Sequence, residues 1–278
     1  MNIYDIAKEA GVSISTVSRV MNKKENVNPA TRKKVEEILE KNNYTPSAIA
    51  RGMVSKTMKT VAILTVDIRV PHYSRTAYTI EREFSRRGYE VLLCNTGGEL
   101  SETVKYLRTV QEKKVDGIVL VGSVFNTLCK KEEIGKLLKN TPVVLANGKL
   151  ELPSYGIHNG KGYVIETERS IEGGMRAVNQ LLLDKKEFTG IVCGEDLTAV
   201  GVVKALLHAG LRVPEDVAVT GYNNSDYAAI CEPELTTVDN KPEMVAMMSV
   251  QLLTSLIEKT EAYSSCTIQP ELVKGRTT

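Results

Sequence analysis

The fold of the first part of this chain is decided by one stretch, Gly11-Val12-Ser13-Ile14-Ser15-Thr16-Val17-Ser18-Arg19-Val20-Met21-Asn22. Gly11 can adopt the left-handed conformation that ends a preceding helix, and Ser13 is a good N-cap for the next one. Apolar residues then recur at helical spacing and predict one buried face, formed by Val17, Val20 and Met21. The opposite face carries Ile14, Ser15, Ser18 and Arg19. A helix this thin and polar suits a DNA major groove, although a small helical hairpin that binds nothing would show the same pattern.

Two further helices flank this stretch. Asn2 can cap a helix from about Ile3 to Ala10, and Asn28 followed by Pro29 is a typical start for a third helix, which runs to about Lys41. Three short helices at this spacing predict a compact helix-turn-helix unit.

The charge distribution separates this unit from the rest of the chain. Residues 1–59 contain 11 Lys or Arg and 6 Asp or Glu, whereas the remainder contains 25 and 28. A basic head on a mildly acidic body is typical of a nucleic-acid-binding protein. On charge alone, a solvated helix surface is a fair alternative.

The composition is that of a globular protein, and it excludes several classes. The five cysteines are widely spread without a C-x-x-C pair, which indicates reduced thiols in a cytoplasm and no zinc site. We find no signal peptide and no apolar run long enough to cross a bilayer. Motifs for catalysis are absent as well. We therefore expect a cytoplasmic protein that is not an enzyme and has no catalytic residues, cofactor or metal.

From Thr60 onward, apolar strands alternate with amphipathic helices. This pattern predicts a doubly wound, mostly parallel sheet, whose ligands bind beyond the carboxyl ends of the strands. The expected strands are 61–66, 91–94, 118–121, 143–146, 163–165, 190–193, 217–219, 235–238 and 267–272. The expected helices are 77–87, 102–113, 132–139, 171–183, 197–209 and 242–259. The residues at the expected ligand edge of the first sheet are Asp67, His72, Tyr73, Asn95, Ser123 and Asn147.

Several separated motifs resemble the LacI/GalR family of bacterial transcriptional regulators. The head carries Asp5-Ile6-Ala7, Ala10-Gly11-Val12-Ser13 and Thr16-Val17-Ser18-Arg19-Val20, and the stretch Tyr44-Thr45-Pro46-Ser47-Ala48-Ile49-Ala50-Arg51 is similar to the family's hinge helix. The resemblance implies a helix-turn-helix DNA-binding domain at 1–45, a hinge helix and linker at 46–59, and a periplasmic-binding-protein-like core at 60–278. It divides that core into a first lobe at 60–155 and 241–260 and a second lobe at 156–240 and 261–278.

The resemblance also implies roles for individual residues. Ile14, Ser15 and Arg19 match positions that touch base edges, where Arg19 could make a bidentate bond to a guanine. Ala50 and Met53 match the hinge positions that enter the minor groove, where paired hinge helices kink the duplex. The positions that bond phosphates and fix the register match Tyr4, Ser13, Thr16, Asn22, Asn28 and Thr31, and Ser47 belongs to the hinge. For Ser13 and Asn28, helix capping is the simpler interpretation, and both roles can hold together.

The second lobe departs from the family pattern. After Tyr155 the chain runs almost directly into Gly156 and the strand expected at Tyr163, so about two strands and two helices of the family are missing, with the arginine that usually grips the effector. Glu195 stands where Asn is common, Asn223 where an effector-binding Asp is common, and Arg169 where an aromatic often packs on the ligand. The effector-binding residues that the resemblance implies are Asp67, His72, Tyr73, Ser123, Asn147, Arg169, Glu195 and Asn223.

These observations predict a sequence-specific DNA-binding regulator, a homodimeric repressor of carbohydrate-related genes. Its heads would read a near-palindromic operator, and a small-molecule effector, usually a sugar in the family, would control it. Two alternatives stay open. One is a soluble sugar-binding protein without DNA function, and the other is a deletion-shortened repressor that binds DNA without responding to an effector.

Overall fold

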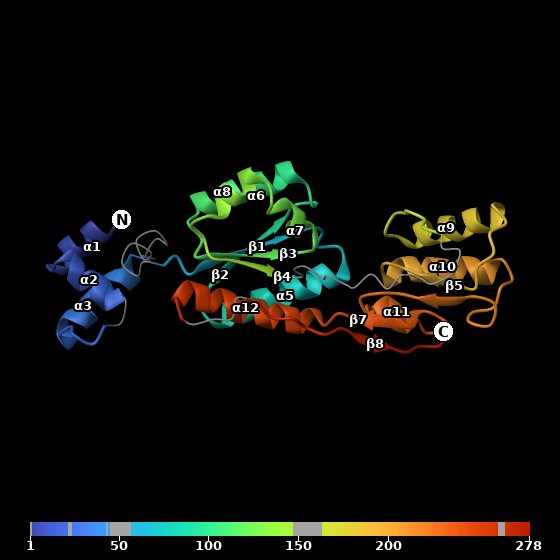
Figure 1. Cartoon of the computed structure of the whole chain (residues 1–278). Coiled ribbons are helices and arrows are strands. Elements are labelled where there is room, and N and C mark those ends of the chain that lie inside the picture. Colours follow the sequence, from blue (N-terminus) through green and yellow to red (C-terminus); the bar gives the residue numbers. More distant parts are fainter. Residues whose placement is uncertain (1, 22–23, 43, 45–56, 147–162, 261–264) are drawn as a thin grey trace. The chain divides into compact units, whose positions relative to one another are not determined.

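The computed structural model describes residues 2–21, 24–42, 44, 57–146, 163–260 and 265–278. The chain forms two compact units, Met1–Lys59 and Thr60–Thr278 (Figure 1). The described part of the first unit contains α1 (Ile3–Ala10), α2 (Ile14–Met21) and α3 (Pro29–Lys41), at the positions predicted from the sequence.

Capping residues set where these helices begin and end. The Asn2 side chain accepts bonds from the backbone of Tyr4 and Asp5, and the Asp5 carboxylate accepts one from the Asn2 backbone at 2.8 Å. This reciprocal capping box satisfies backbone donors that the first turn leaves without a partner. Gly11 ends α1 in the left-handed conformation, with a φ of 66°, and so allows the turn into α2.

The core of the first unit is made by one face of each helix. Val17 and Val20 of α2 are fully or almost fully buried, and they share a cluster with residues of both neighbouring helices. The other buried members of this cluster are Ile6, Ala7, Ala10, Val35 and Ile38. The apolar spacing read from the sequence is therefore the spacing that packs the three helices together.

The second unit begins with a parallel sheet. Its strands are β1 (Thr60–Thr65), β2 (Glu90–Asn95), β3 (Gly117–Val121) and β4 (Val143–Ala146), arranged in the order β2-β1-β3-β4. The helices α6 (Leu100–Glu112) and α8 (Glu132–Leu138) cover one face. The other face is covered by α5 (Pro71–Arg86) and α12 (Pro242–Glu258) (Figure 1).

The central strand β1 is buried on both faces. Val61 and Ile63 pack toward α5 and α12, whereas Ala62 and Leu64 pack toward the α6 side. This explains the unbroken apolar run in the sequence, since a parallel strand covered by helices on both faces needs apolar side chains at every position.

The second lobe contains a smaller set of strands. It comprises α9 (Ile171–Leu183), β5 (Gly190–Val192), α10 (Asp196–His208), β6 (Ala218–Thr220), α11 (Asp226–Ile230), β7 (Thr237–Asp239) and β8 (Glu271–Val273). Among the described residues β5 pairs with β6 alone, in parallel, and β7 pairs with β8 in antiparallel fashion. Thr220 and Thr236 form a single bridge between these two pairs.

Exposed apolar residues mark where this lobe is incomplete. Val192 of β5 is 86% exposed, whereas Val219, opposite Ile191 on β6, is fully buried. The strand predicted at Tyr163–Ile165 is wrong, because this segment forms no ladder with any described residue and Val164 is 93% exposed. The apolar residues of the segment therefore find no sheet neighbour to pack against.

Other boundaries differ from the sequence prediction in smaller ways. The helix predicted from Ala77 begins at Pro71 instead, because proline is well suited to the first helical position. The short helices α7 (Val124–Leu128) and α11 were not predicted, since five residues are too few to show a helical period.

Close backbone packing holds α9 on α10. A Cβ atom on Gly174 would lie 2.1 Å from the Thr198 carbonyl oxygen, and one on Gly201 would lie 2.0 Å from the Ile171 carbonyl oxygen. Glycine is required at both positions because any side chain would force the two helices apart. This contact stabilises the second lobe although its sheet is short.

Candidate nucleic-acid interface and ligand cleft

The exposed face of α2 carries the residues that the sequence analysis assigned to base contacts. Ile14, Ser15 and Arg19 are exposed there, on the side opposite the buried Val17 and Val20. The helix therefore presents two short side chains and one long guanidinium to solvent. Short side chains let a helix approach base edges closely, and a guanidinium supplies the paired donors that match a guanine.

Hydroxyl groups organise the first turn of α2. The Ser13 hydroxyl accepts a bond from the Thr16 backbone at 3.2 Å, so Ser13 caps the helix as predicted. The same hydroxyl lies 2.8 Å from the Ser15 hydroxyl and 2.9 Å from the Thr16 hydroxyl. A helix start with several donors attracts phosphate groups through both its hydrogen bonds and its dipole.

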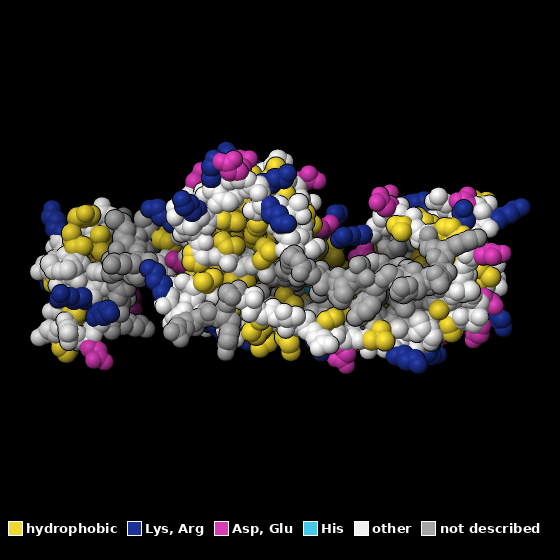
Figure 2. Space-filling view, in the orientation of Figure 1, with side chains coloured by type: hydrophobic (Ala, Val, Ile, Leu, Met, Phe, Trp, Pro, Cys, Tyr) yellow, Lys and Arg dark blue, Asp and Glu magenta, His cyan; other side chains and the backbone are white. Residues whose placement is uncertain are grey.

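The remaining predicted DNA contacts of the first unit divide into two groups. Tyr4, Ser13 and Asn28 are exposed, and Asn28 also caps α3 by accepting a bond from the Ala30 backbone at 2.9 Å. Thr16 and Thr31 are half-buried. Figure 2 shows several Lys and Arg side chains on the visible face of this unit. Four predicted contacts, Asn22, Ser47, Ala50 and Met53, lie outside the described residues.

The first lobe places polar groups after its strands, as the sequence pattern predicts. Asp67 follows β1 and accepts bonds from the Arg69 side chain at 2.8 and 3.0 Å, which lowers the pKa of the Asp67 carboxyl. Asn95 accepts a bond from the Ile68 backbone at 2.8 Å, and Ser123 is exposed after β3. Asn147, predicted at the end of β4, lies outside the described residues.

His72 and Tyr73 lie in the first turn of α5 and are both buried. Their ring centroids are 5.5 Å apart, and the Tyr73 ring packs against Gly122 after β3. Burial lowers the pKa of His72 to about 4, although the neighbouring Asn240 side chain opposes this shift. His72 is therefore a neutral imidazole at neutral pH.

Three predicted effector residues of the second lobe have different surroundings. Burial raises the pKa of Glu195, while the positive charge of Arg169 opposes that shift. Arg169 also lowers the pKa of Asp67, so its charge acts on carboxylates of both lobes. Asn223 adopts a positive φ of 99°, and its side-chain oxygen accepts a bond from the Asn240 side chain at 2.8 Å.

The sequence pattern did not identify Arg75, Asp196 or Asn240. The buried Asp196 carboxylate accepts bonds from the backbone and hydroxyl of Ser225 at 2.6 and 2.9 Å and one from the Thr237 hydroxyl. It thus ties α10 to the loop before α11 and to β7, which is a structural role. Arg75 and Asn240 showed no pattern of their own, because their partners are far away in the sequence.

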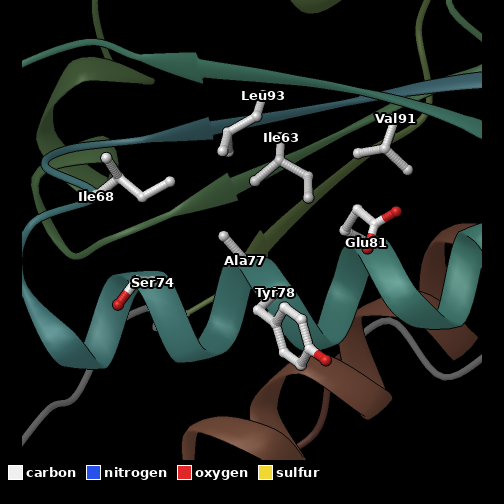
Figure 3. A pocket seen from close by; sticks show the side chains of 8 residues that line it. All are labelled: Ile63, Ile68, Ser74, Ala77, Tyr78, Glu81, Val91 and Leu93. Atoms are coloured by element: carbon white, nitrogen blue, oxygen red, sulfur yellow. The ribbon is translucent and has the colours of Figure 1, made fainter.

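An apolar groove lies between α5 and the edge strand β2. Figure 3 shows Ile63, Val91 and Leu93 projecting from the strands and Ala77 and Tyr78 lying on α5. The groove has a volume of about 320 Å³, and Ile68, Ser74 and Glu81 complete its lining. Leu93 is 47% exposed although it is a strand residue. The groove is thus an apolar surface next to an edge strand.

The described part of the chain contains neither a cluster of metal ligands nor a membrane-spanning helix. No group of three or more potential metal ligands is brought together there. Among the described helices, none has the length and apolar character to cross a membrane.

The first unit packs three helices around an apolar core and exposes one face of the second helix, and a two-lobed α/β unit follows it. This arrangement defines a helix-turn-helix transcriptional regulator. Models of protein families match accordingly: bacterial regulatory proteins of the lacI family at residues 2–47, periplasmic binding proteins and sugar binding domain of LacI family at 57–158, and the periplasmic binding protein-like domain at 151–278. The chain belongs to the LacI family of bacterial regulatory proteins.

Curated relatives extend over the whole chain. An HTH-type transcriptional regulator of Lachnoclostridium phytofermentans is 31% identical, and the alignment covers 100% of this chain and 99% of the relative. Catabolite control protein A of Priestia megaterium is 30% identical over 99% of this chain and 98% of its own length. Each alignment spans 331 positions, 53 more than the 278 residues of this chain, so the shortening predicted from the sequence is confirmed.

Solved structures share the fold. The lac repressor dimer bound to operator and the anti-inducer ONPF has a TM-score of 0.84 at 20% identity, covering 100% of this chain and 98% of that chain. A complex of the transcriptional regulator CelR with cellobiose has a TM-score of 0.66 at 21% identity, covering 100% of both chains. The predicted helix-turn-helix head and periplasmic-binding-protein-like core are therefore confirmed.

The buried imidazole makes stability depend on pH. An unfolded histidine has a pKa near 6.5, so between about pH 6.5 and 4 the unfolded chain binds a proton that folded His72 does not. Stability is therefore lost as the pH falls through this window. The free energy of unfolding of the wild type should fall between pH 7.5 and pH 4.5. We expect this fall to be smaller by roughly 2 kcal/mol in His72→Gln, measured by urea unfolding at both pH values.

His208→Gln serves as the matched control, because His208 is an exposed histidine at the end of α10. This variant should keep the pH dependence of the wild type. An identical pH dependence in His72→Gln and wild type would show that His72 does not stay neutral in the folded protein.

Proposed function

We propose that this protein is a repressor that binds a near-palindromic operator as a homodimer and responds to a small-molecule effector in the cleft of its second unit. The observation that carries the proposal is the exposed face of α2, where Ser15 and Arg19 stand opposite a buried apolar face. We infer that it acts in the cytoplasm, where its DNA lies, and that it is not an enzyme, since its curated relatives are transcriptional regulators. The fusion to a DNA-binding head argues against a soluble sugar-binding protein without DNA function.

In this proposal, α2 reads base edges and its neighbours hold the phosphate backbone. Arg19 bonds a guanine, and Ile14 and Ser15 contact neighbouring bases in the major groove. The hinge residues Ala50 and Met53 widen and kink the central minor groove, where Met53 is the apolar wedge. The phosphate contacts come from Tyr4, Ser13, Thr16, Asn22, Asn28 and Thr31, together with Ser47 of the hinge.

Arg19→Ala tests the assignment of the recognition helix. An operator is first selected from random double-stranded DNA with the full-length wild type, and binding is then measured by gel shift. We expect Arg19→Ala to weaken binding to the selected operator by about tenfold or more, because a bidentate contact to a guanine discriminates by about 1–3 kcal/mol. Binding to random DNA should weaken much less.

Lys41→Ala is the matched control, since it removes the same charge from an exposed residue at the end of α3. This variant should weaken binding to the operator and to random DNA by similar, small factors. If Arg19→Ala kept the preference for the operator, α2 would not be the element that reads sequence.

The homodimer would form along β2 and the apolar groove beside it. An edge strand with exposed apolar residues tends to find a partner, and a two-fold axis would place the same surface of a second chain against it. Leu93, Tyr78 and Ile68 supply exposed apolar area at this edge. The lac repressor, which shares this fold, was solved as a dimer, and this supports a dimeric state.

Leu93→Lys should therefore produce monomers. A charge at the centre of an apolar interface leaves an unpaired ammonium group buried in the dimer. Light scattering coupled to size-exclusion chromatography measures the mass directly. The control is Leu207→Lys, at a residue of α10 that is 44% exposed against 47% for Leu93, and it should remain a dimer. A Leu93→Lys variant that stays dimeric would place the interface elsewhere.

The effector would bind beyond the carboxyl ends of the strands, between the two lobes. We expect the effector to be contacted by polar and charged residues of both lobes, and the described ones are Asp67, His72, Tyr73, Ser123, Arg169, Glu195 and Asn223. Asn147 would join them from the segment outside the described residues. The alternative, a repressor without effector response, is favoured by the missing 53 positions and by the internal bond of Asn223.

A thermal-shift screen with monosaccharides and disaccharides separates these two candidates. A ligand that binds the folded state at 100 times its Kd stabilises it by about 2.7 kcal/mol, which raises the Tm by several degrees. We expect at least one sugar to produce such a rise, and Glu195→Gln to reduce it. The absence of any shift across the panel would favour the repressor without effector response.

A further inference from the structure

One arginine connects the two lobes. Arg75 lies on α5 of the first lobe, and its Nε donates to Glu243 Oε1 at 2.9 Å in the first turn of α12. Its Nη2 lies 2.8 Å from the same oxygen, so the ion pair is made by two nitrogens. A third nitrogen, Nη1, donates to the backbone oxygen of Asn224 at 3.3 Å, in the loop that follows β6 of the second lobe. The guanidinium therefore bonds both lobes at once.

An asparagine makes the second connection. Asn240 follows β7 at the crossover into α12, directly before Lys241, whose φ of 54° turns the chain. Its Nδ2 donates to the Asn223 side-chain oxygen at 2.8 Å, and the Asn240 side chain lies beside the buried His72 of α5, whose pKa it influences. The Asn240 side chain is thus bonded to the loop after β6 and lies next to the first turn of α5.

The residues at both ends of these connections are held within their own lobes by further hydrogen bonds or by core packing. In the second lobe, the Asn223 backbone donates to the Val238 oxygen at 2.9 Å, and Ser225 is held by the buried Asp196. The loop formed by residues 223–225 must therefore move with the second lobe. In the first lobe, α5 and α12 pack on the same face of the sheet in one apolar core.

We propose that Arg75 and Asn240 form a latch that holds the loop of residues 223–225 against the first lobe when the cleft contains no small molecule. The inference deepens the proposed function, because it concerns how that cleft is regulated. Asn223 is one of the effector-binding residues that the resemblance implies, and its side-chain oxygen already accepts a hydrogen bond from the Asn240 amide. The Asn240 amide uses one of the two lone pairs of this oxygen, so a sugar hydroxyl that donates to it has only the other available.

The latch shifts the equilibrium between closed and open lobes by a small free energy. The Arg75 and Glu243 side chains are 42% and 49% exposed, and ion pairs with such access to water contribute little. The Asn240 bond exchanges a bond to water for one within the protein, so its net effect is small too. We expect each connection to change the ratio of closed to open lobes by up to about tenfold. An equilibrium of this size can be shifted by a ligand of ordinary affinity.

The test is hydrogen exchange of the full-length protein, read by mass spectrometry, together with small-angle X-ray scattering. Arg75→Met and Asn240→Ala should each speed exchange in the peptides that contain residues 223–225 by about threefold to tenfold, and each should raise the radius of gyration. Arg75→Lys should restore part of the protection, because lysine keeps the charge opposite Glu243. Melting temperatures should change little, since the latch joins two folded lobes.

Arg108→Met is the matched control. Arg108 forms an exposed ion pair with Glu133 at 3.1 Å, and both residues belong to the first lobe. This variant should leave exchange at residues 223–225 and the scattering profile unchanged. The latch is refuted if Arg75→Met and Asn240→Ala behave like Arg108→Met. Since the measurement uses neither DNA nor sugar, its outcome is independent of whether the proposed DNA binding and effector response hold.

Discussion

The burial of one face of α2 is the interaction on which the account of this protein depends. Val17 and Val20 are held in the core by apolar residues of α1 and α3, among them Ile6 and Val35. Because the helical period is fixed, burying these two valines turns Ser15 and Arg19 outward. The same packing that folds the first unit therefore exposes the side chains that we propose to read DNA.

A different constraint governs the second unit. Parallel strands are stable when helices cover both faces, and β1 meets this condition with apolar residues on each side. The shortened second lobe meets it only in part, since Val192 is exposed on β5. The buried Asp196 network and the close contact of α9 with α10 at Gly174 and Gly201 compensate for the short sheet. The lobe thus retains a core of its own, although the chain as a whole is shorter than its relatives.

The local features of this fold could be predicted from the sequence, whereas the pairing of distant residues could not. The bounds of α1, α3 and α9 follow from capping residues and apolar spacing, which are local signals. The strand at 163–165 was predicted wrongly because a strand needs a neighbour that the sequence pattern does not reveal. At the candidate site, the exposed residues of α2 followed from the helical period. The bonds of Arg75 and Asn240 did not, because they join residues 17 and 149 or more positions apart.

Hydroxyl-radical footprinting of the full-length protein on DNA selected by the wild type shows whether two recognition helices bind one symmetric operator. If two heads read DNA through α2 in a symmetric dimer, each strand should show two protected half-sites related by a two-fold axis, with their centres about one helical turn apart. Between the half-sites, the cleavage of the DNA backbone should change where the minor groove is opened. A single protected patch without symmetry, or uniform protection along the DNA, would contradict the account.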